Sequence, residues 1–538
     1  MIKAIRGTRD LLPPETALWN FVEAAVRDVF RVYNFHEIRT PIFEETQLFA
    51  RSVGEETDIV SKEMYTWEEG PDPETTLLGA WYDQRKSRYP GSLQRTTARQ
   101  DLITIDISGG ADTYLVELKL RPDAGVVDRL EARKRAWLAA HPGSKPPKLI
   151  LAVPTWEEDR AKRIPLGEII LDSLSVNLAG EQSPQSLTLR PENTAGVVRA
   201  YIEHKLWDRG LNKLYYIGPQ FRRERPQKGR YRQFYQIGAE IIGPPTAGSE
   251  SPARDAELLE LLATFLDRVG ITDWTLQLNS IGCANDRAKY NDALRKALEP
   301  VVSKMCSDCQ RRAVTNPLRV FDCKVPEDQP IIEKLPRISQ FLDEPCRKHF
   351  EEVQGILKSV GVEFQLNDRL VRGLDYYTRT AFEFTHGALG AQNAILGGGR
   401  YDGLSESLGG PSAPGIGFAI GEDRLVMALK ESAEAVQRKP DVYIAPLPGM
   451  NREAARLARE LRHHDVITEL GDENFRLKKS LETASKIGAR FALIVGENEV
   501  KAGAFALKNL ESGEQVSVPR SELAQKISEL ARKIQSGR

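Results

Sequence analysis

Two strand-like segments joined by a short basic loop constrain the fold of this chain more than any other feature. The segments KLYYIGPQFRRE and YRQFYQIGAEIIG lie on either side of the loop RPQKGR (residues 225–230). Side chains in the second segment alternate with a period of two, which is typical of a β-strand. One face would carry Arg232, Phe234, Gln236 and Gly238, and the other Gln233, Tyr235, Ile237 and Ala239. The pattern predicts an antiparallel hairpin with one face turned toward a pocket.

Arginine is dense in this hairpin and indicates a phosphate-bearing ligand. Planar guanidinium groups bind phosphate oxygens through two parallel hydrogen bonds, which favours a nucleotide or a nucleic acid. A solvated surface is the alternative for such a run of charge. A second segment, VRGLDYYTRTAFEF (residues 371–384), again combines arginines, carboxylates and tyrosines in an apolar frame, so we predict a site for a polyphosphate and a small polar ligand. The arginines of the hairpin are Arg222, Arg223, Arg225, Arg230 and Arg232.

Composition limits the class of protein further. The chain has 538 residues, a net charge of -1 and 41% hydrophobic residues, which is typical of a soluble protein with about three or four domains. A net charge near zero gives no general attraction for polyanions, so nucleic acid would bind to local patches. The sequence contains no apolar run of membrane-spanning length, and its five cysteines are odd in number. We therefore expect a cytoplasmic protein with reduced thiols.

The order of the predicted elements is that of an α+β protein. Residues 14–33 are predicted to form an amphipathic helix that ends near Asn34, and EIRTPIFEE an edge strand interrupted by Pro41. After the linker QRKPD the pattern changes to alternating strands and helices, which predicts a separate α/β domain. The expected domains are 1–69 and 185–436 for a core with a helical subdomain at about 285–360, 70–184 for an inserted domain, and 441–538 for a C-terminal domain.

Five segments resemble the histidine–tRNA ligase family of the class II aminoacyl-tRNA synthetases. The first helix with EIRTPIFEE, the pair FRRERPQKGRYRQF, and GIGFAIGEDRLV match the three class II motifs. Two signatures of the histidine enzymes are matched by RGLDYYTRTAFEF and GGGRYDGL. The resemblance covers roughly residues 1–68 and 186–535. It implies an antiparallel catalytic sheet, a C-terminal anticodon-binding domain and, through the first motif, a homodimer.

The resemblance also implies a reaction and its participants. With ATP and Mg²⁺, the family joins L-histidine to the histidine tRNA through a histidyl adenylate, and it releases pyrophosphate and AMP. Cations fixed around the α-phosphate would stabilise the charge that gathers there in the first step. By resemblance, Arg372 and Arg222 are catalytic, and Arg222, Arg230, Arg424 and Glu224 bind ATP. The residues that bind histidine, again by resemblance, are Glu192, Thr194, Gln236, Glu240, Tyr376, Tyr377 and Tyr401.

Two positions depart from the family pattern. Asn193 follows RPE where glycine is common, and we expect the turn to be kept because asparagine tolerates positive φ. Asp423 stands in GEDRL where glutamate is usual, which leaves open whether this carboxylate approaches the nucleotide. In the C-terminal domain a basic face for tRNA is one interpretation and a solvated surface the other. The candidates for this face are Arg476, Lys478, Lys479 and Lys486.

The cysteines form a pattern outside these motifs. Cys306, Cys309 and Cys323 have the spacing C-x2-C-x13-C, and Cys346 and His349 follow farther on. Four such ligands can hold a zinc ion. Because the spacing to a fourth ligand is irregular, we expect reduced, partly buried thiols, with zinc as the alternative.

Residues 70–184 lie where the family usually has a short connection. ETTLLGAWYDQRKSR and VVDRLEARKRAWLAAH predict helices, and DLITIDISG, DTYLVELKLRPD and KLILAVP predict strands. With Asp106, Glu117 and Lys119 as a D…ExK pattern, this order resembles the restriction-endonuclease-like fold, which implies that the two acids bind Mg²⁺. Strand alternation would place Glu117 and Lys119 on one face. A structural or RNA-contacting insert is the alternative to a nuclease.

Two other functions stay open beside the ligase. One is the regulatory subunit of the histidine-biosynthesis ATP phosphoribosyltransferase, which resembles the ligase without joining histidine to tRNA. That paralogue typically lacks the C-terminal domain and an intact histidine signature, and both are present here. The other is a ligase with an additional nuclease-like activity in the insert.

Overall fold

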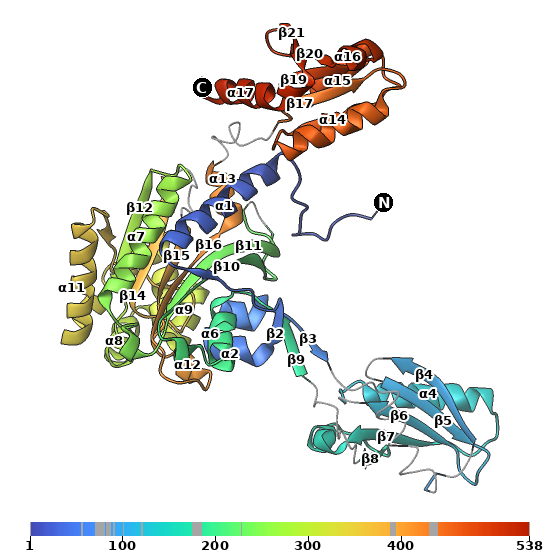
Figure 1. The fold of residues 1–538 in the computed structure, drawn as a ribbon. Helices are drawn as coiled ribbons and strands as arrows, with labels where there is room; N and C mark the ends of the chain where they lie inside the picture. The colour runs from blue at the N-terminus through green and yellow to red at the C-terminus, as the bar shows by residue number, and fades with distance from the viewer. Residues whose placement is uncertain are drawn as a thin grey trace. The chain divides into compact units, whose positions relative to one another are not determined.

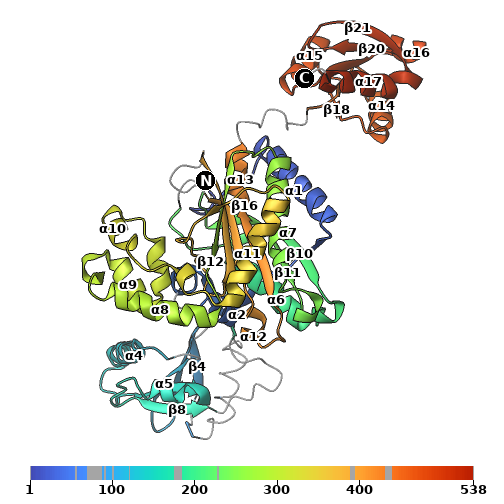
Figure 2. The same cartoon turned by 90° about the vertical axis from the view of Figure 1, so that its left-hand side faces the viewer.

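The fold is that of a computed structural model (Figures 1 and 2). It describes residues 2–54, 57–69, 81, 88–89, 92–99, 102–119, 122–174, 185–226, 229–387, 394–429 and 439–536. The chain divides into two compact units, residues 1–9 with 28–425 and residues 10–27 with 426–538. Among the described residues, every helix is too short or too polar to cross a membrane.

The core of the first unit is a sheet with the strand order β1-β10-β11-β16-β15-β14-β12-β13. In the described part of the chain its interior pairs are antiparallel, and the two edge pairs are parallel. The predicted hairpin is β10 with β11, paired from Phe221 opposite Gln233 to Asn212 opposite Ile242. The antiparallel core that the sequence predicted is therefore confirmed. Its strands are β1 (His36–Glu37), β10 (Asn212–Phe221), β11 (Gln233–Ile242), β12 (Trp274–Ser280), β13 (Gln365–Leu366), β14 (Thr378–His386), β15 (Ala394–Arg400) and β16 (Gly415–Gly421).

Helices of the first unit pack against this sheet through aromatic side chains. The ring of Phe30 in α1 lies 5.5 Å from Tyr215 of β10, and 6.0 Å from both Phe265 of α7 and Phe418 of β16. The first helix ends as predicted, because Asn34 has a φ of 63° that a helix cannot continue. Helices that lie wholly within the first unit include α2 (Thr46–Val53), α6 (Thr194–Glu203), α7 (Pro252–Arg268) and α12 (Leu404–Ser407), with a π-helix at Ile59–Glu63. Two helices cross the boundary between the units: α1 (Glu15–Val32) belongs to the first unit from Asp28 on, and α13 (Glu422–Leu429) up to Leu425.

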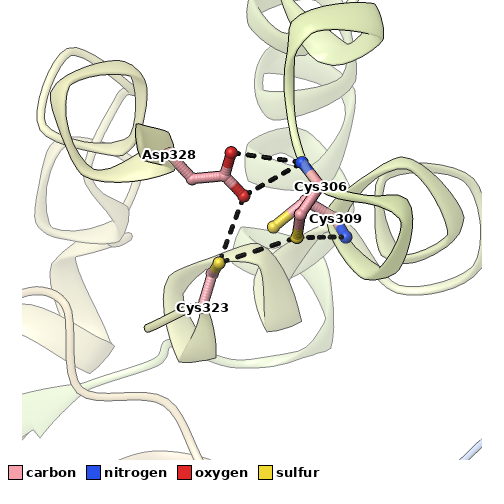
Figure 3. A group of neighbouring side chains, drawn as sticks. All are labelled: Cys306, Cys309, Cys323 and Asp328. Carbon is pink, nitrogen blue, oxygen red and sulfur yellow. Dashed lines mark hydrogen bonds between the residues drawn. The ribbon is translucent and has the colours of Figure 1, made fainter. Parts of the chain in front are cut away.

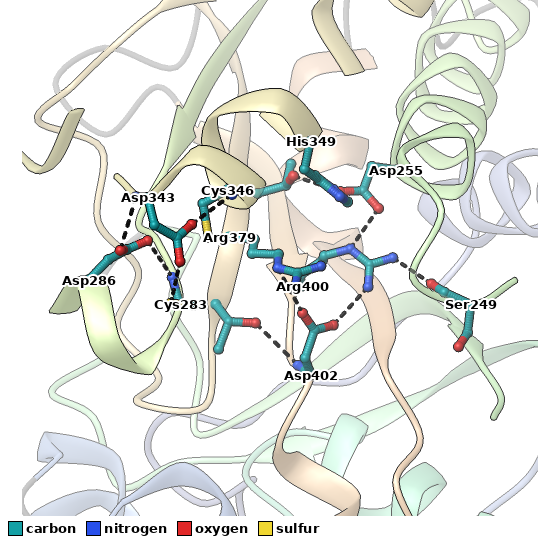
Figure 4. Close-up of polar contacts among 12 residues, drawn as sticks. Ser249, Asp255, Cys283, Asp286, Asp343, Cys346, His349, Arg379, Arg400 and Asp402 are labelled. Carbon is teal, nitrogen blue, oxygen red and sulfur yellow. Dashed lines mark hydrogen bonds and ion pairs between the residues drawn. The ribbon is translucent and has the colours of Figure 1, made fainter. Parts of the chain in front are cut away.

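A buried polar network holds α7 and α11 against β14 and β15 (Figure 4). Arg400 Nε donates to Asp255 Oδ1 at 2.9 Å, and both side chains are fully buried. Thr380 Oγ1 and His349 Nε2 lie 2.6 and 2.8 Å from the other oxygen of Asp255. Burial alone would raise the pKa of Asp255, but Arg400 and His349 lower it. The carboxylate is therefore charged and paired, which is the condition for burying it.

The segment EIRTPIFEE forms two short strands in different sheets. β1 lies at the edge of the central sheet, whereas β2 (Phe43–Glu45) pairs with β9 (Gln185–Leu189), which also pairs with β3 (Tyr65–Glu69). The prediction of a single edge strand is wrong. Pro41 has no amide hydrogen for a ladder, and the chain changes sheet between the two strands.

A helical region lies between β12 and β13 in the chain. An apolar core that includes Tyr290, Leu294, Cys309 and Ile332 holds it together. Its elements are α8 (Ala284–Leu298), α9 (Ser307–Thr315), the 3-10 helix η7 (Pro317–Asp322), α10 (Gln329–Ile332) and α11 (Glu344–Ser359).

The described part of the insert has a sheet of its own, with the order β4-β5-β6-β7-β8. Pairing is antiparallel from β4 to β6 and parallel from β6 to β8. The three predicted strands are present as β5, β6 and β7, and the second predicted helix as α4, whereas β4 and β8 were not predicted. The helix predicted at ETTLLGAWYDQRKSR lies almost entirely outside the described residues. The elements are β4 (Ser92–Arg99), β5 (Leu102–Ser108), β6 (Tyr114–Lys119), α4 (Val126–Ala140), β7 (Lys148–Pro154), α5 (Glu158–Ala161) and β8 (Ile170–Leu174).

The second unit contains the predicted C-terminal α/β domain. Its sheet has the order β18-β17-β19-β20-β21, with parallel pairing among the first three strands. Apolar residues of the strands, such as Ile444 and Phe491, pack against Leu457 of α14. The elements are β17 (Val442–Pro446), α14 (Asn451–His463), β18 (Thr468–Leu470), α15 (Leu477–Lys486), β19 (Phe491–Val495), α16 (Glu497–Ala502), β20 (Ala504–Asn509), β21 (Gln515–Pro519) and α17 (Leu523–Ser536).

Candidate active site

Four arginines predicted from distant parts of the sequence line one cavity of the first unit. Arg222 and Arg230 come from the β10–β11 hairpin, Arg372 precedes β14, and Arg424 lies in α13. The cavity has a volume of about 510 Å³, within the range of small-ligand sites. The predicted residues Glu224 and Gln236 also line it. The arginines that were predicted to surround a polyphosphate are thus brought together around one space.

The hairpin arginines are held by neighbours of the hairpin itself. Arg222 Nε donates to the carbonyl oxygen of Pro191 at 2.9 Å, and its guanidinium lies 5.2 Å from the centre of the Phe234 ring. Arg230 donates to Glu224 at 3.3 Å. Burial, and then the charge of Arg230, lower the pKa of Arg424. Two cations that repel each other would be stabilised by an anion bound between them.

Arg372 is placed by a carboxylate and by a glycine. Its Nη1 donates to Glu383 of β14 at 2.8 Å. Gly397 of β15 lies opposite Glu383 in the antiparallel register, and a Cβ at Gly397 would lie 2.6 Å from the guanidinium nitrogens of Arg372. Any larger residue at this position would therefore displace the arginine. Arg372 Nε is buried and has no hydrogen-bond partner among the described residues, so this donor is free for a ligand.

A cluster of buried carboxylates and hydroxyls adjoins the arginine cavity. Glu240 accepts hydrogen bonds from Thr194 Oγ1 and from the Tyr401 hydroxyl, both at 2.7 Å. Glu192 accepts from the backbone N–H groups of Thr194 and Ala195 at 2.7 and 3.0 Å, at the start of α6. These side chains are buried and do not line the cavity itself.

Tyrosines and one amide complete the buried cluster. The rings of Tyr376 and Tyr377 lie 4.7 Å apart, and Tyr376 lies 5.9 Å from Tyr401. Gln236 lies on the same face of β11 as Glu240 and also lines the arginine cavity. Its Oε1 is buried without a hydrogen-bond partner in the described part of the chain. Gln236 therefore joins the buried cluster to the cavity.

The carboxylates of the buried cluster are shifted toward their neutral forms. Burial raises the pKa of Glu240 to about 8, with a further rise from Glu192 and opposition from the bonds of Thr194 and Tyr401. Burial likewise raises the pKa of Glu192, although its two backbone hydrogen bonds and Arg222 lower it in part. A ligand that brings a cationic ammonium group and ring N–H donors would stabilise the charged carboxylates, and such perturbed groups often mark functional sites.

The space for Glu240 depends on a glycine in the neighbouring strand. Gly417 of β16 lies opposite Glu240 in the register, and a Cβ there would overlap Glu240 Oε2 and lie 2.5 Å from its Cδ. A glycine inside a strand commonly marks the close approach of another group.

Several cavity residues were not predicted from the sequence. Glu383 had a local signal, because it alternates with Phe382 and Phe384 along the strand TAFEF. Asp58, Arg319 and Lys324 come from segments without a recognised motif, and no local pattern indicated their place in the cavity wall.

The structure places the two residues that depart from the family pattern. Asn193 has a φ of −121°, so the turn is kept without the positive φ that was offered as the reason. Its side-chain oxygen accepts a bond from Thr40 at 2.6 Å. Asp423 does line the cavity, where it accepts bonds from Arg9 at 2.8 Å and from the backbone of Tyr235 at 3.2 Å.

The residue that completes the cysteine group is neither Cys346 nor His349. His349 binds Asp255, and Cys346 lies in a separate group with Cys283, so neither completes the C-x2-C-x13-C pattern. The residue beside Cys306, Cys309 and Cys323 is Asp328.

In the insert, the D…ExK residues each have a partner of opposite charge. Arg133 pairs with Asp106, and Arg129 donates twice to the buried Glu117, at 3.0 and 2.5 Å. Lys119 pairs with an aspartate of the following loop. Among the described residues, the clusters able to share a metal ion do not include Asp106 or Glu117. The residues of the D…ExK pattern are therefore arranged as a set of ion pairs beneath α4.

Fold and site together define a class II aminoacyl-tRNA synthetase: an antiparallel sheet carries an arginine-lined cavity, and an α/β domain follows. Residues 171–425 match the Histidyl-tRNA synthetase family, and residues 441–530 match the Anticodon binding domain family. Together with the relatives described next, these matches show that the chain belongs to the histidine–tRNA ligase family.

Two relatives and one solved structure support this assignment. The chain is 55% identical to the histidine–tRNA ligase of Koribacter versatilis over 97% of this chain and 95% of that protein. It is 46% identical to the histidine–tRNA ligase of Solibacter usitatus over 98% and 99% of the two chains. The chain is 30% identical in sequence to apo S. aureus histidyl-tRNA synthetase, whose crystal structure superimposes on it with a TM-score of 0.64. The superposition covers 98% of this chain and 100% of that one. The predicted family, fold and enzyme class are thus confirmed.

Proposed function

We propose that this chain ligates L-histidine to the histidine tRNA in two steps at the site described above. In the first step, a carboxylate oxygen of histidine attacks the α-phosphorus of ATP, the bond to the β-phosphate oxygen breaks, and pyrophosphate leaves. In the second step, a terminal ribose hydroxyl of the tRNA attacks the carbonyl carbon of the histidyl adenylate, and AMP leaves. One observation carries this proposal: the cavity that the four predicted arginines line adjoins a buried carboxylate–tyrosine cluster, and Gln236 belongs to both.

The arginines divide between catalysis and ATP binding. Arg222 and Arg372 stabilise the negative charge that develops on the α-phosphate, because preorganised donors in a partly buried site act without further reorganisation. The unpartnered Nε of Arg372 supports this role. Arg230 and Arg424 bind the remainder of the nucleotide, and Glu224 orients Arg230 through their ion pair.

The same cavity fits the Mg²⁺ ion expected with ATP. Glu224 and Glu383 line the cavity, and Mg²⁺ in nucleotide sites takes one or two carboxylates together with phosphate oxygens. These two residues would hold the ion, which would neutralise charge on the phosphates. Each of these carboxylates also pairs with an arginine, so the Mg²⁺ ion and the arginines would together neutralise the charge of the phosphates.

The buried cluster selects histidine. Glu240 receives one ring nitrogen of the imidazole and Tyr377 the other, which fixes the ring tautomer. Glu192, Thr194 and Gln236 receive the α-ammonium group, and the free Oε1 of Gln236 supports this role. A site built to hydrogen-bond its substrate rejects analogues without those groups by ~10⁴-fold or more. Tyr376 and Tyr401 form the remaining wall of the amino-acid site.

The C-terminal domain would contact the anticodon region of the tRNA. Its candidate basic side chains are exposed, and guanidinium or ammonium groups there would meet phosphates of the RNA. The residues are Arg476, Lys478, Lys479 and Lys486. The proposed domains are the catalytic core (residues 1–69 and 185–436), the inserted domain (70–184) and the anticodon-binding domain (441–538). The proposed location of the protein is the cytoplasm.

A homodimer is the proposed assembly. Ile42, Phe43 and Trp67 are exposed at 45%, 53% and 40%, and the rings of Phe43 and Trp67 lie 6.0 Å apart. Exposed apolar side chains grouped in this way are typical of a protein–protein contact. Light scattering coupled to size exclusion would test it, with Phe43→Glu expected to shift the mass to that of a monomer.

Exchange of labelled pyrophosphate into ATP tests the proposed function directly. Exchange should require histidine and fail with the other amino acids, and charging should require the histidine tRNA. Exchange with a different amino acid, or none with histidine, would refute the proposal. The regulatory-subunit alternative predicts histidine binding without exchange. The nuclease alternative gains no support from ion-paired Asp106 and Glu117, and it predicts cleavage of DNA or RNA with Mg²⁺ that Glu117→Gln abolishes.

A further inference from the structure

Three thiols and one carboxylate converge in the helical region, outside the site described above. Figure 3 shows the sulfur atoms of Cys306, Cys309 and Cys323 turned toward one another and toward Asp328. One ligand atom from each residue lies within 4.8 Å of all the others. The sulfurs of Cys306 and Cys323 are 3.9 Å apart, and Asp328 Oδ2 is 3.2 Å from the sulfur of Cys323.

These separations are those of a tetrahedral shell around a single ion. With metal–sulfur bonds of about 2.3 Å and a metal–oxygen bond of about 2.0 Å, tetrahedral geometry places two sulfurs roughly 3.8 Å apart and a sulfur and an oxygen roughly 3.5 Å apart. Both observed distances lie close to these values. Three soft sulfurs with one carboxylate oxygen favour zinc over the hard ions Mg²⁺ and Ca²⁺, which take oxygen ligands.

Backbone donors around the cluster are arranged to stabilise thiolates. The N–H of Cys309 donates to the sulfur of Cys306 at 3.5 Å, and the N–H of Val325 donates to the sulfur of Cys323 at 3.4 Å. The N–H of Cys306 donates to Asp328, at 3.1 and 3.2 Å from its two oxygens. Such outer contacts orient metal ligands and tune their basicity.

Most of the cluster is buried, and no protein cation pairs with it among the described residues. Cys309, Cys323 and Asp328 are all buried, and the ion pairs of the described residues do not include Asp328. A bound divalent cation would deprotonate the three thiols and supply the missing positive charge.

A second cluster of similar composition provides a contrast within the same protein. Cys283, Asp286, Asp343 and Cys346 also lie close together (Figure 4), but they cap two helices. Asp286 accepts the N–H groups of Cys283 and Asp343 at 3.2 and 3.0 Å, and Asp343 accepts the N–H of Cys346 at 2.8 Å. Helix capping explains these carboxylates. Cys306 likewise caps α9, because its sulfur accepts the N–H of Cys309, but capping leaves the convergence of the other two thiols and Asp328 on that sulfur unexplained.

We propose that Cys306, Cys309, Cys323 and Asp328 bind one structural Zn²⁺ ion. The ion joins the start of α9 to the end of η7 and to the residue before α10. The segment between these ligands carries Arg319, and Lys324 follows Cys323 directly; both side chains line the arginine cavity. By holding this segment, the zinc ion would position Arg319 and Lys324 in the wall of the nucleotide site without lying in that site.

Metal analysis of the full-length protein, purified under reducing conditions from zinc-supplemented cells, tests the site. We expect about one zinc per chain in the wild type, and a loss of about tenfold or more in Cys309→Ser. Asp328→Asn should keep the fold and bind zinc more weakly. Cys283→Ser is the matched control, because serine is a good helix N-cap and this variant should retain its zinc.

Cobalt substitution gives a readout that does not depend on how the variants fold. Wild-type protein loaded with Co²⁺ should show thiolate-to-metal charge-transfer absorption and tetrahedral d–d bands, both displaced by Zn²⁺ and unaffected by Mg²⁺. Wild-type protein without zinc and without these bands after reconstitution would overturn the proposal, whether its thiols are reduced or joined in a disulfide. Zinc retained in Cys309→Ser but lost in Cys283→Ser would overturn it too. Neither readout depends on ligase activity, so a failure here is separate from a failure of the proposed function.

Discussion

Gly417→Ala is the smallest change that should damage histidine recognition while sparing ATP binding. Gly417 lies directly opposite Glu240, and an added Cβ would overlap Glu240 Oε2 and lie 2.5 Å from Cδ. Ordinary carbon contacts are about 3.5–4.0 Å, so the carboxyl group must withdraw by roughly 1 Å or more. Glu240 is fully buried, and its 2.7 Å bond from the Tyr401 hydroxyl cannot survive such a shift.

The cost follows from the broken hydrogen bond and the misplaced carboxylate. Leaving a buried polar group unsatisfied costs about 1–3 kcal/mol, and about 1.4 kcal/mol corresponds to a factor of ten in affinity. The KM for histidine in pyrophosphate exchange should therefore rise about 5- to 150-fold. The KM for ATP should change little, because the added methyl group does not face Arg222 or Arg372.

Gly403→Ala is the matched control for this prediction. It makes the same substitution in the nearby GGGRYDGL segment, where a Cβ would meet nothing within 4 Å. Its kinetic constants should equal those of the wild type within error. A Gly417→Ala enzyme with an unchanged KM for histidine, or with an equal rise in the KM for ATP, would refute the assignment of Glu240 to the imidazole site.

Three further predictions concern single side chains. Arg372→Lys keeps the charge but loses the forked geometry, so the rate of pyrophosphate exchange at saturating substrates should fall about a hundredfold or more. A fall of about threefold or less would contradict a catalytic role. Arg400→Met leaves the carboxylate of Asp255 buried without its main cation, which should lower the free energy of unfolding in urea by about 3–5 kcal/mol; an unchanged midpoint would show that the network is dispensable. Burial raises the pKa of Glu240 from its ordinary value of 4.5 to about 8 in the folded protein. The neutral carboxyl group therefore stabilises the folded state fully at acid pH, and this contribution to the free energy of unfolding is lost as the pH rises toward 8. Relative to Glu240→Gln, the wild type without histidine should lose about 1.4 kcal/mol per pH unit between pH 6 and 7.5; parallel pH profiles of the two proteins would contradict the shift.

Strand alternation and local motifs predicted the parts of the fold that depend on near neighbours in sequence. The β10–β11 hairpin, the first helix and the order of elements in the C-terminal domain follow from such patterns, because side-chain periodicity reflects which face is buried. Pro41 was recognised as an interruption, but a sequence does not show that the chain will cross from one sheet to another at that point. The strands β4 and β8 were missed because their sequences, SLQRTTAR and ILDSL, alternate weakly.

The candidate site was predictable where a motif named its residues and hidden where distant segments meet. Four arginines of the cavity lie in recognised motifs, whereas Arg319 and Lys324 reach the cavity wall only through the packing of the helical region. Asp328 was missed for a different reason. A fourth ligand to zinc was expected to be a cysteine or a histidine, and a carboxylate five residues after Cys323 did not fit that pattern.

The glycines of β15 and β16 connect these observations, because they explain how a continuous sheet can hold a site with so many large polar groups. The segment LGGGRYDG matched a signature of the histidine enzymes, and its Gly397 lies inside strand β15. It faces Glu383 across the β14–β15 pair, and Gly417 faces Glu240 across the β11–β16 pair. In both pairs a functional carboxylate has a cross-strand neighbour with no side chain, and that space is taken by the carboxylate itself or by its partner Arg372. Where the strand register places a glycine opposite an acidic residue, the pair therefore indicates a site recessed into the sheet.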